Sequence, residues 1–294
     1  MPRGLQSIIP LLVLPILLPF SHAWGEDGHR IVCRIAQGRL REEPREVLEE
    51  LLPDFAHNDL GNVCSWPDRA RYWLPWSTAL HYVNTPDLIC GYDYDRDCRD
   101  AAGTGEKGMC VSGAVKNYTD QLLRHRGPPL ADGDYNLTQS LLFLSHFMAD
   151  IHQPLHAGFS SDKGGSTIEV HWFSKKSNLH SVWDEGIIET AKQRFYNNSV
   201  EAMIQDIDRN ITGVWADQVP AWLGCSSEDT CPDVDAAESV RVACDWAYRN
   251  ATNGTALGDD YFLTRLPVVY MRLAQAGVRL AFALNNVLWD ADED

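Results

Sequence analysis

The amino-acid sequence predicts a mainly α-helical protein that contains one small β-hairpin. Residues 136–153 and 258–288 repeat apolar side chains at the spacing of buried helices. The clearest strand pattern is confined to residues 167–173, where apolar side chains alternate with polar ones. No internal repeat and no Gly/Ser-rich or Pro-rich linker divides the chain, so we expect a single domain.

The first helices follow from local signals. One begins near Gly28, and Ile31, Val32 and Ile35 then lie on the same face. The next begins at Pro44, because proline suits the first turn of a helix. These two segments are expected to precede the longer central helix.

The remaining elements are placed by turn and cap residues. Residues 87–111 hold three cysteines among Asp and Gly and indicate a stapled surface loop. A helix should follow from Ser112, acting as its N-cap, to His125. After the strand, helix is expected to resume near His180 and again over residues 233–250.

Residues 1–23 have the pattern of a secretory signal peptide. Arg3 precedes an apolar run, and small residues follow it up to Ala23. The run is short for a membrane span and contains three prolines. We therefore expect cleavage before Trp24 and a secreted protein without membrane association, either extracellular or in the lumen of a vacuole or endomembrane compartment.

Cysteines and sequons agree with export. The mature part contains eight cysteines and no C-x-x-C pair, which favours disulfides over a zinc–thiolate site. Six Asn-X-Ser/Thr sequons mark positions for N-glycans, at Asn117, Asn136, Asn197, Asn210, Asn250 and Asn253. The composition is thus typical of a disulfide-bonded glycoprotein.

The charge balance is acidic. Removal of residues 1–23 leaves 24 basic and 41 acidic residues, a net charge of −17. Such a surface repels polyanions, which argues against a stable nucleic-acid-binding module. The constraint is weaker for an enzyme that releases its products, because divalent cations in a cleft can reverse the local charge.

The segment from His146 to Asp184 contains the strongest chemical pattern. His146 and Asp150 stand four residues apart, His156 follows, and His180 and Asp184 again stand four apart. On a helix this spacing places two side chains on one face, where imidazole and carboxylate can bind one divalent ion. Five ligands exceed the four that one tetrahedral zinc needs, so the pattern predicts a multinuclear metal site.

An isolated histidine on a helix is more often a hydrogen-bonded core residue than a ligand. Here the helix around His146 and Asp150 is apolar almost all round, and buried polar groups are costly unless they are paired or metal-bound. His152 also stands four residues before His156, but Pro154 should disrupt a helical pair between them. We therefore expect no metal at His152.

Four further positions stay ambiguous on local grounds. His29 could cap the first helix, or it could bind metal beside the α-amine that cleavage would create at Trp24. Asp68 could be an ordinary helix cap, and His81 an ordinary loop histidine.

Six motifs occur in the following order along the chain: WGEDGH, WPD, LHYVNTPD, HFMADIHQPLH, GG-x-x-I and NLHSVWD. Over about residues 24–284 they closely resemble the zinc-dependent, single-strand-preferring nucleases of fungi and plants, especially the plant bifunctional nucleases. The resemblance implies an all-α fold shared with the zinc phospholipases C, a trinuclear zinc cleft, and single-stranded RNA, single-stranded DNA and 3′-nucleotides as substrates. A polar tail, residues 285–294, would be removed as in plant members.

The resemblance also implies which residues bind the three Zn²⁺. One ion would take Asp68, His81, His146 and Asp150, and a second would take His156, His180 and Asp184. The third would take the amine and carbonyl of Trp24, His29 and the other oxygen of Asp150. The disulfides implied by the resemblance are Cys33–Cys64, Cys90–Cys244, Cys98–Cys110 and Cys225–Cys231.

Zinc lowers the pKa of bound water and so supplies hydroxide without a protein base. Hydroxide between the zincs that share Asp150 would attack phosphorus, and the zinc of His156 would stabilise the departing O3′. Arg71 matches the family position of a cation against the phosphate, so we expect it rather than Arg69 to stabilise charge in the transition state. The products would be 5′-phosphate nucleotides, with 3′-nucleotidase activity besides.

Three positions bear on the substrate cleft, and the first two of them bear on base recognition. Tyr82 matches an aromatic position that stacks on a base, and a flat ring tolerates any base. Asn84 stands where fungal relatives carry Asp, and its amide both donates and accepts, so base preference should differ. Ser166 replaces the Asn of the usual GGN pattern.

Two rival interpretations remain. A zinc phospholipase C would use the same trinuclear site on a phospholipid head group. A non-catalytic glycoprotein would hold zinc for stability alone, and the complete ligand set, Asp150 included, argues against it. The nuclease interpretation, with the chain acting as a monomer, is the one favoured by the motif order and by Tyr82.

Overall fold

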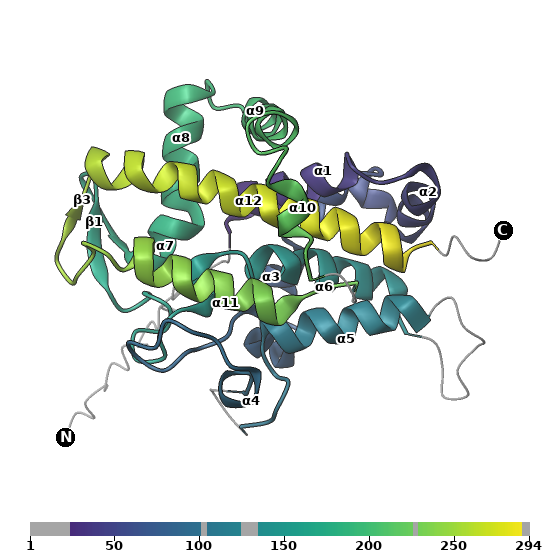
Figure 1. Ribbon diagram of the computed structural model, residues 1–294, viewed down its shortest axis with the longest axis horizontal. Coiled ribbons are helices and arrows are strands. Elements are labelled where there is room, and N and C mark those ends of the chain that lie inside the picture. The colour runs from purple at the N-terminus through teal and green to yellow at the C-terminus, as the bar shows by residue number, and fades with distance from the viewer. Residues whose placement is uncertain (1–23, 101–104, 125–134, 226–228, 290–294) are drawn as a thin grey trace, which may run out of the picture.

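The computed structural model describes residues 24–100, 105–124, 135–225 and 229–289, and these residues are mostly helical (Figure 1). The expected signal peptide, and any structure it forms, lies outside the described residues. Among the described residues, no helix is both long and apolar enough to cross a membrane.

Helices dominate both halves of the chain. The first half contains α1 (Glu26–Gln37), α2 (Glu42–Leu51), η1 (Asp54–Ala56), η2 (Leu60–Asn62), α3 (Trp66–Ala70), η3 (Pro75–His81), α4 (Tyr94–Asp97), α5 (Val111–Leu123) and α6 (Leu137–Asp150). The second half contains η5 (Pro154–Ala157), β1 (Glu169–Trp172), β2 (Lys175–Asn178), α7 (Leu179–Ser181), η6 (Val182–Gly186), α8 (Ile187–Phe195), α9 (Val200–Thr212), α10 (Val219–Trp222), α11 (Pro232–Val242), η7 (Ala243–Ala247), β3 (Ala256–Leu257) and α12 (Asp259–Val287).

Two helices organise the core. Helix α6 is buried at every position from Ser140 to Asp150, as its apolar sequence predicts, and it packs against α5, α1 and α12. Helix α12 extends along most of the length of the molecule in Figure 1 and contacts α1, α6 and α8. Val287 and Leu288 are buried, so the core continues past residue 284, where the sequence suggested that the domain ends. Removal of the tail stays a prediction.

The predicted hairpin is present and is part of a larger sheet. Strands β1 and β2 pair antiparallel, with Glu169 opposite Asn178 and Trp172 opposite Lys175. Strand β3 then pairs parallel to β1 on its other edge, which the sequence pattern did not indicate. A two-residue strand is too short to show periodicity.

Several helix boundaries differ from the prediction. Helix α5 begins at Val111, and the N-cap is Cys110, whose Sγ accepts a hydrogen bond from the Gly113 N–H. The prediction of Ser112 as the cap is wrong, because the extended backbone of Cys110 starts the helix earlier and leaves the Ser112 hydroxyl to donate to Asp233. His125 lies outside the described residues.

All four disulfides implied by the family resemblance are confirmed: Cys33–Cys64, Cys90–Cys244, Cys98–Cys110 and Cys225–Cys231. The first matters most for the site. It ties α1 to the segment that leads into α3, and so it joins the helix of His29 to the helix of Asp68.

Candidate metal centre

Eight buried His and Asp side chains converge in three groups. Within each group, one nitrogen or oxygen atom per residue lies within 4.8 Å of the others. The groups are His29, His146 and Asp150; Asp68, His81 and His146; and His156, His180 and Asp184. The sequence-predicted His and Asp ligands therefore all meet, although they come from seven separate elements.

Each element presents its residue for a local reason. Helix α6 turns His146 and Asp150 to the same side because they are one turn apart. Asp184 lies in η6, a π-helical turn between α7 and α8, and such turns often occur at functional sites. Periodicity predicts an α-helical turn there, so the sequence offers no signal for this irregularity.

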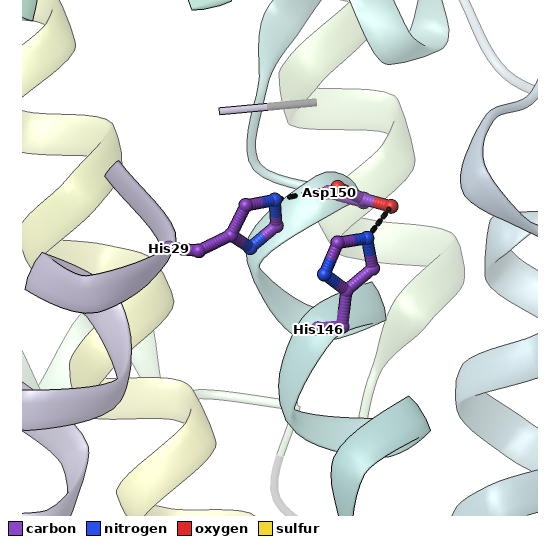
Figure 2. A group of neighbouring side chains, drawn as sticks. All are labelled: His29, His146 and Asp150. Atoms are coloured by element: carbon purple, nitrogen blue, oxygen red, sulfur yellow. Dashed lines mark ion pairs between the residues drawn. The ribbon is translucent and has the colours of Figure 1, made fainter. Parts of the chain in front are cut away.

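Asp150 lies between His29 and His146 of the first group (Figure 2), and it also lies against His81 of the second. Its Oδ2 lies 3.0 Å from His81 Nδ1 and 3.1 Å from His146 Nε2. Its Oδ1 lies on the other side, 3.4 Å from His29 Nε2. The two carboxylate oxygens thus face different histidines, which is the arrangement required of a carboxylate that bridges two metal ions.

Several buried polar atoms at this centre make no hydrogen bond within the described residues. They are both ring nitrogens of His29, Nε2 of His81, Oδ1 of Asp150 and the indole nitrogen of Trp24. A buried polar atom without a partner costs about 1–3 kcal/mol. Two of them, His29 Nε2 and Asp150 Oδ1, lie 3.4 Å apart, and an imidazole nitrogen beside a carboxylate oxygen fits a divalent cation.

Backbone carbonyls orient three of the histidine rings. The Nδ1–H of His146 donates to Cys64 O at 2.8 Å, that of His156 to His81 O at 2.6 Å, and that of His180 to Gly164 O at 2.6 Å. Since a carbonyl can only accept, each Nδ1 holds the proton and each Nε2 is left as the ligand atom. Such outer partners fix ring orientation at metal sites.

Gly164 explains why the third carbonyl reaches His180. Its φ is +61°, and a Cβ there would lie 2.2 Å from the Leu155 carbonyl oxygen. Only glycine allows this close approach, which places Gly164 O against the imidazole. The following Gly165 also has a positive φ, so the GG motif serves to shape the turn that supports His180.

Burial keeps most of these histidines neutral. It lowers the pKa of His29 to about 3, of His81 to about 4 and of His180 to about 3. Burial also opposes protonation of His146, but the carboxylates of Asp150 and Asp68 outweigh it and raise that pKa. Neutral imidazole is the form that binds metal.

The predicted ancillary residues flank the groups. Arg71 is mostly buried and donates from Nη2 to Asp68 Oδ1 at 2.9 Å. Burial and then Asp100 raise the pKa of the Tyr82 hydroxyl, and the charge of Arg71 opposes them, which places Arg71 and Tyr82 in the same neighbourhood. Arg69, by contrast, is exposed.

Tyr82 and Asn84 lie on one side of the strand-like segment after His81. The N–H groups of Val83 and Thr85 donate to His156 O and Gly158 O, and both side chains are buried. Because side chains alternate along extended backbone, the half-buried Tyr82 and Asn84 face the other way. Ser166 is half-buried directly after Gly165.

Trp24 and His152 show how the N-terminus and the excluded histidine are placed. Trp24 is fully buried against Gly28, and the next residue, Gly25, donates its N–H to Asp184 O. The backbone next to Trp24 is therefore bound to the main chain at Asp184, a residue of the third group. His152 belongs to none of the groups, since its Nδ1–H donates to Met148 O and its Nε2 accepts from Arg279.

Sequence reasoning overlooked one residue in contact with the site. Gln153 is fully buried, and its amide donates to Asp184. Its place between Asp150 and His156 was the available signal, but a glutamine in a turn has no periodic pattern that distinguishes it from a surface residue.

Comparison with known proteins places residues 24–289 in one family. The family model described as S1/P1 Nuclease matches residues 24–289. Endonuclease 2 of Arabidopsis thaliana is 50% identical over 287 residues, which cover 97% of this chain and 98% of that protein. Endonuclease 1 of the same plant is 47% identical over 95% of this chain and 93% of its own length. Nuclease S1 of Aspergillus oryzae is 30% identical over 98% of both chains.

Proposed function

Because this chain belongs to the S1/P1 nuclease family, we propose that it is a secreted zinc-dependent endonuclease with 3′-nucleotidase activity. It hydrolyses single-stranded RNA and DNA to 5′-phosphate nucleotides. The observation that supports this most directly is the pair of Asp150 oxygens directed at different histidines inside a buried set of metal-binding groups.

The proposed ligand sets follow the groups. One zinc would be held by Asp68, His81, His146 and Asp150, and a second by His156, His180 and Asp184. A third would be held by the amine and carbonyl of Trp24, by His29 and by the other oxygen of Asp150. His146 is close enough to belong with His29 as well. Its Nδ1–H is bound to Cys64 O, so a single nitrogen remains for one ion.

Bound zinc supplies hydroxide at neutral pH and a Lewis acid for the leaving O3′. The protein provides the rest. Asp150 would hold two metal positions, one through each oxygen, and burial keeps the ligand histidine His29 in the neutral form that binds metal. Arg71 is oriented by Asp68, and its guanidinium charge would stabilise a phosphate on which charge develops in the transition state.

Tyr82 and Asn84 form the proposed base site. The Tyr82 ring stacks on the base at the scissile bond, and the Asn84 amide hydrogen-bonds its edge. Both lie on the side of the segment that faces away from the core. Stacking tolerates any base, which suits a nuclease that degrades mixed sequences.

We also propose that the protein is exported, monomeric and glycosylated. Five of its sequon asparagines are exposed on the structure, and the sixth, Asn210, is half-buried. N-glycans are proposed at all six positions, and the location is extracellular or in the lumen of a vacuole or endomembrane compartment.

The test is a product analysis by mass spectrometry. Secreted protein that begins at Trp24 is incubated with a single-stranded RNA oligonucleotide and with its DNA counterpart. We expect 5′-mononucleotides from both, inhibition by a chelator and recovery with zinc. Intact oligonucleotides together with three bound zincs would contradict the proposal and favour hydrolysis of a phospholipid head group, which the same protein can be assayed for directly.

A further inference from the structure

Gln153 is fully buried, and both its backbone and its side-chain amide make hydrogen bonds next to the metal centre. It follows α6 and precedes η5, so it stands between the metal-binding positions Asp150 and His156. Its backbone N–H donates to Asp150 O at 2.9 Å, and its backbone carbonyl accepts from the His156 N–H at 3.0 Å. The chain is therefore closely held on both sides of Gln153.

The side-chain amide connects two more parts of the site. Its Oε1 accepts from the Leu155 N–H at 2.5 Å, and its Nε2 donates to Asp184 Oδ1 at 2.5 Å. The assignment of oxygen and nitrogen is decided by chemistry, because the Leu155 N–H can only donate and an ionised Asp184 can only accept. Rotating the amide by half a turn would place like groups against each other at both ends.

This amide joins two ligands of the same metal group. Asp184 is one of them, and His156 lies in the η5 turn that Gln153 caps through Leu155. The third, His180, stands one helical turn before Asp184. A glutamine at this point can therefore set the distance between the turn that carries His156 and the helix that carries His180 and Asp184.

We propose that Gln153 is a positioning residue for the metal ion held by His156, His180 and Asp184: it orients the Asp184 carboxylate and the His156 turn at once. The inference rests on the proposed function, which gives this ion the stabilisation of the leaving oxygen. Mutation of a residue that hydrogen-bonds to a metal ligand typically lowers the affinity for the metal about 10- to 100-fold.

The decisive variant is Gln153→Glu. It keeps an oxygen for the Leu155 N–H and has nearly the same volume, but it replaces the donor to Asp184 with a second carboxylate oxygen. Gln153→Met, which removes both side-chain hydrogen bonds, is the second variant. Gln121→Glu is the matched control, because Gln121 accepts from Ser140 on the α5–α6 contact through an oxygen that the change retains.

The first measurement is zinc content by mass spectrometry after equilibration at graded free zinc. Wild type and Gln121→Glu should retain three zincs per chain. Gln153→Glu should lose one of them at a free zinc concentration roughly 10- to 100-fold higher than wild type does, with the other two retained. Gln153→Met should lose the same single ion.

The second measurement is the dependence on the leaving group. Hydrolysis of a dinucleotide, which expels O3′, should lose kcat in Gln153→Glu with little change in KM. Thymidine 5′-(p-nitrophenyl phosphate) expels a phenolate that leaves without metal assistance, so its hydrolysis should be much less affected. A merely structural role would reduce both rates alike.

The outcomes separate the two proposals. Three zincs bound by Gln153→Glu with wild-type affinity would overturn the role of Gln153 and leave the proposed function intact. Equal weakening of all three ions would also overturn it, because the effect would then be general. Absence of zinc from the wild-type protein would overturn the proposed function itself.

Discussion

The imidazole rings of His29 and His146 are stacked, with centroids 4.0 Å apart and planes inclined by 10°. One ring comes from α1 and the other from α6, and Asp150 lies beside both (Figure 2). After burial, the charge of His146 is the largest factor that lowers the pKa of His29. The pair therefore favours a state in which His29 is neutral and can offer its lone pair to a metal.

Asp150→Asn should reduce activity and zinc content more than Asp184→Asn. An amide has one oxygen, so Asn at position 150 can serve only one of the two sides that Asp150 faces. We expect Asp150→Asn to weaken two zincs and Asp184→Asn to weaken one, measured as zinc per chain at graded free zinc. Equal losses of activity, with all zincs retained in both variants, would argue against a bridging carboxylate.

An extra residue before Trp24 should abolish or strongly reduce activity. Trp24 is fully buried and Gly25 donates its N–H to Asp184 O, so the backbone is fixed here. An extension would move the proposed amine ligand and turn the Trp24 nitrogen into a peptide N–H. The comparison is between secreted protein that begins at Trp24 and the same protein with Ala23 retained. Intact mass should confirm both N-termini. Full activity and full zinc content in the extended form would remove Trp24 from the ligand set.

Arg71→Met should lower kcat/KM about 10²- to 10³-fold, the usual cost of one transition-state donor. The matched control is Arg69→Met, since Arg69 is exposed and two residues away; it should stay near wild type. Arg71 also donates to Asp68, so zinc content must be measured in parallel. Comparable activity of the two variants would contradict the role given to Arg71.

The pH dependence of stability should report on Asp235. Burial raises the pKa of this carboxyl to about 6 from an ordinary value of 3.8, against the opposing charge of Arg279. Glu238, Arg272, Asp233 and His152 also face it. A carboxyl whose folded pKa is raised contributes stability that is fully present below its unfolded pKa and is lost as the pH rises through about 6.

Asp235→Asn cannot titrate, so it should lack that loss. Relative to wild type, its free energy of unfolding should increase by on the order of 2–3 kcal/mol between pH 4 and pH 7. Urea unfolding at saturating zinc measures the difference, and Asp245→Asn, at an exposed position, is the control. Curves for Asp235→Asn and wild type that stay parallel over this range would contradict the raised pKa.

Much of the site could be predicted from the chain because its signals are local. The four-residue spacings of His146 with Asp150 and of His180 with Asp184 depend on helical geometry, and the burial of α6 follows from its apolar sequence. The GG turn before His180 depends on the conformational freedom of glycine. Each of these rests on the properties of a few neighbouring residues.

Other features arise only when distant segments pack. Two of these features join elements that lie far apart in the chain: the stacking of His29 on His146 and the hydrogen bond from Gln153 to Asp184. Two others are the proximity of Arg71 to Tyr82 and the π-helical turn at Asp184. Their geometry depends on the packing of α1, α6 and α12 into one core. Residue types and spacing therefore indicated which side chains meet as candidate metal ligands. The folded core set which oxygen of Asp150 faces which histidine, because that choice depends on contacts between segments rather than within them.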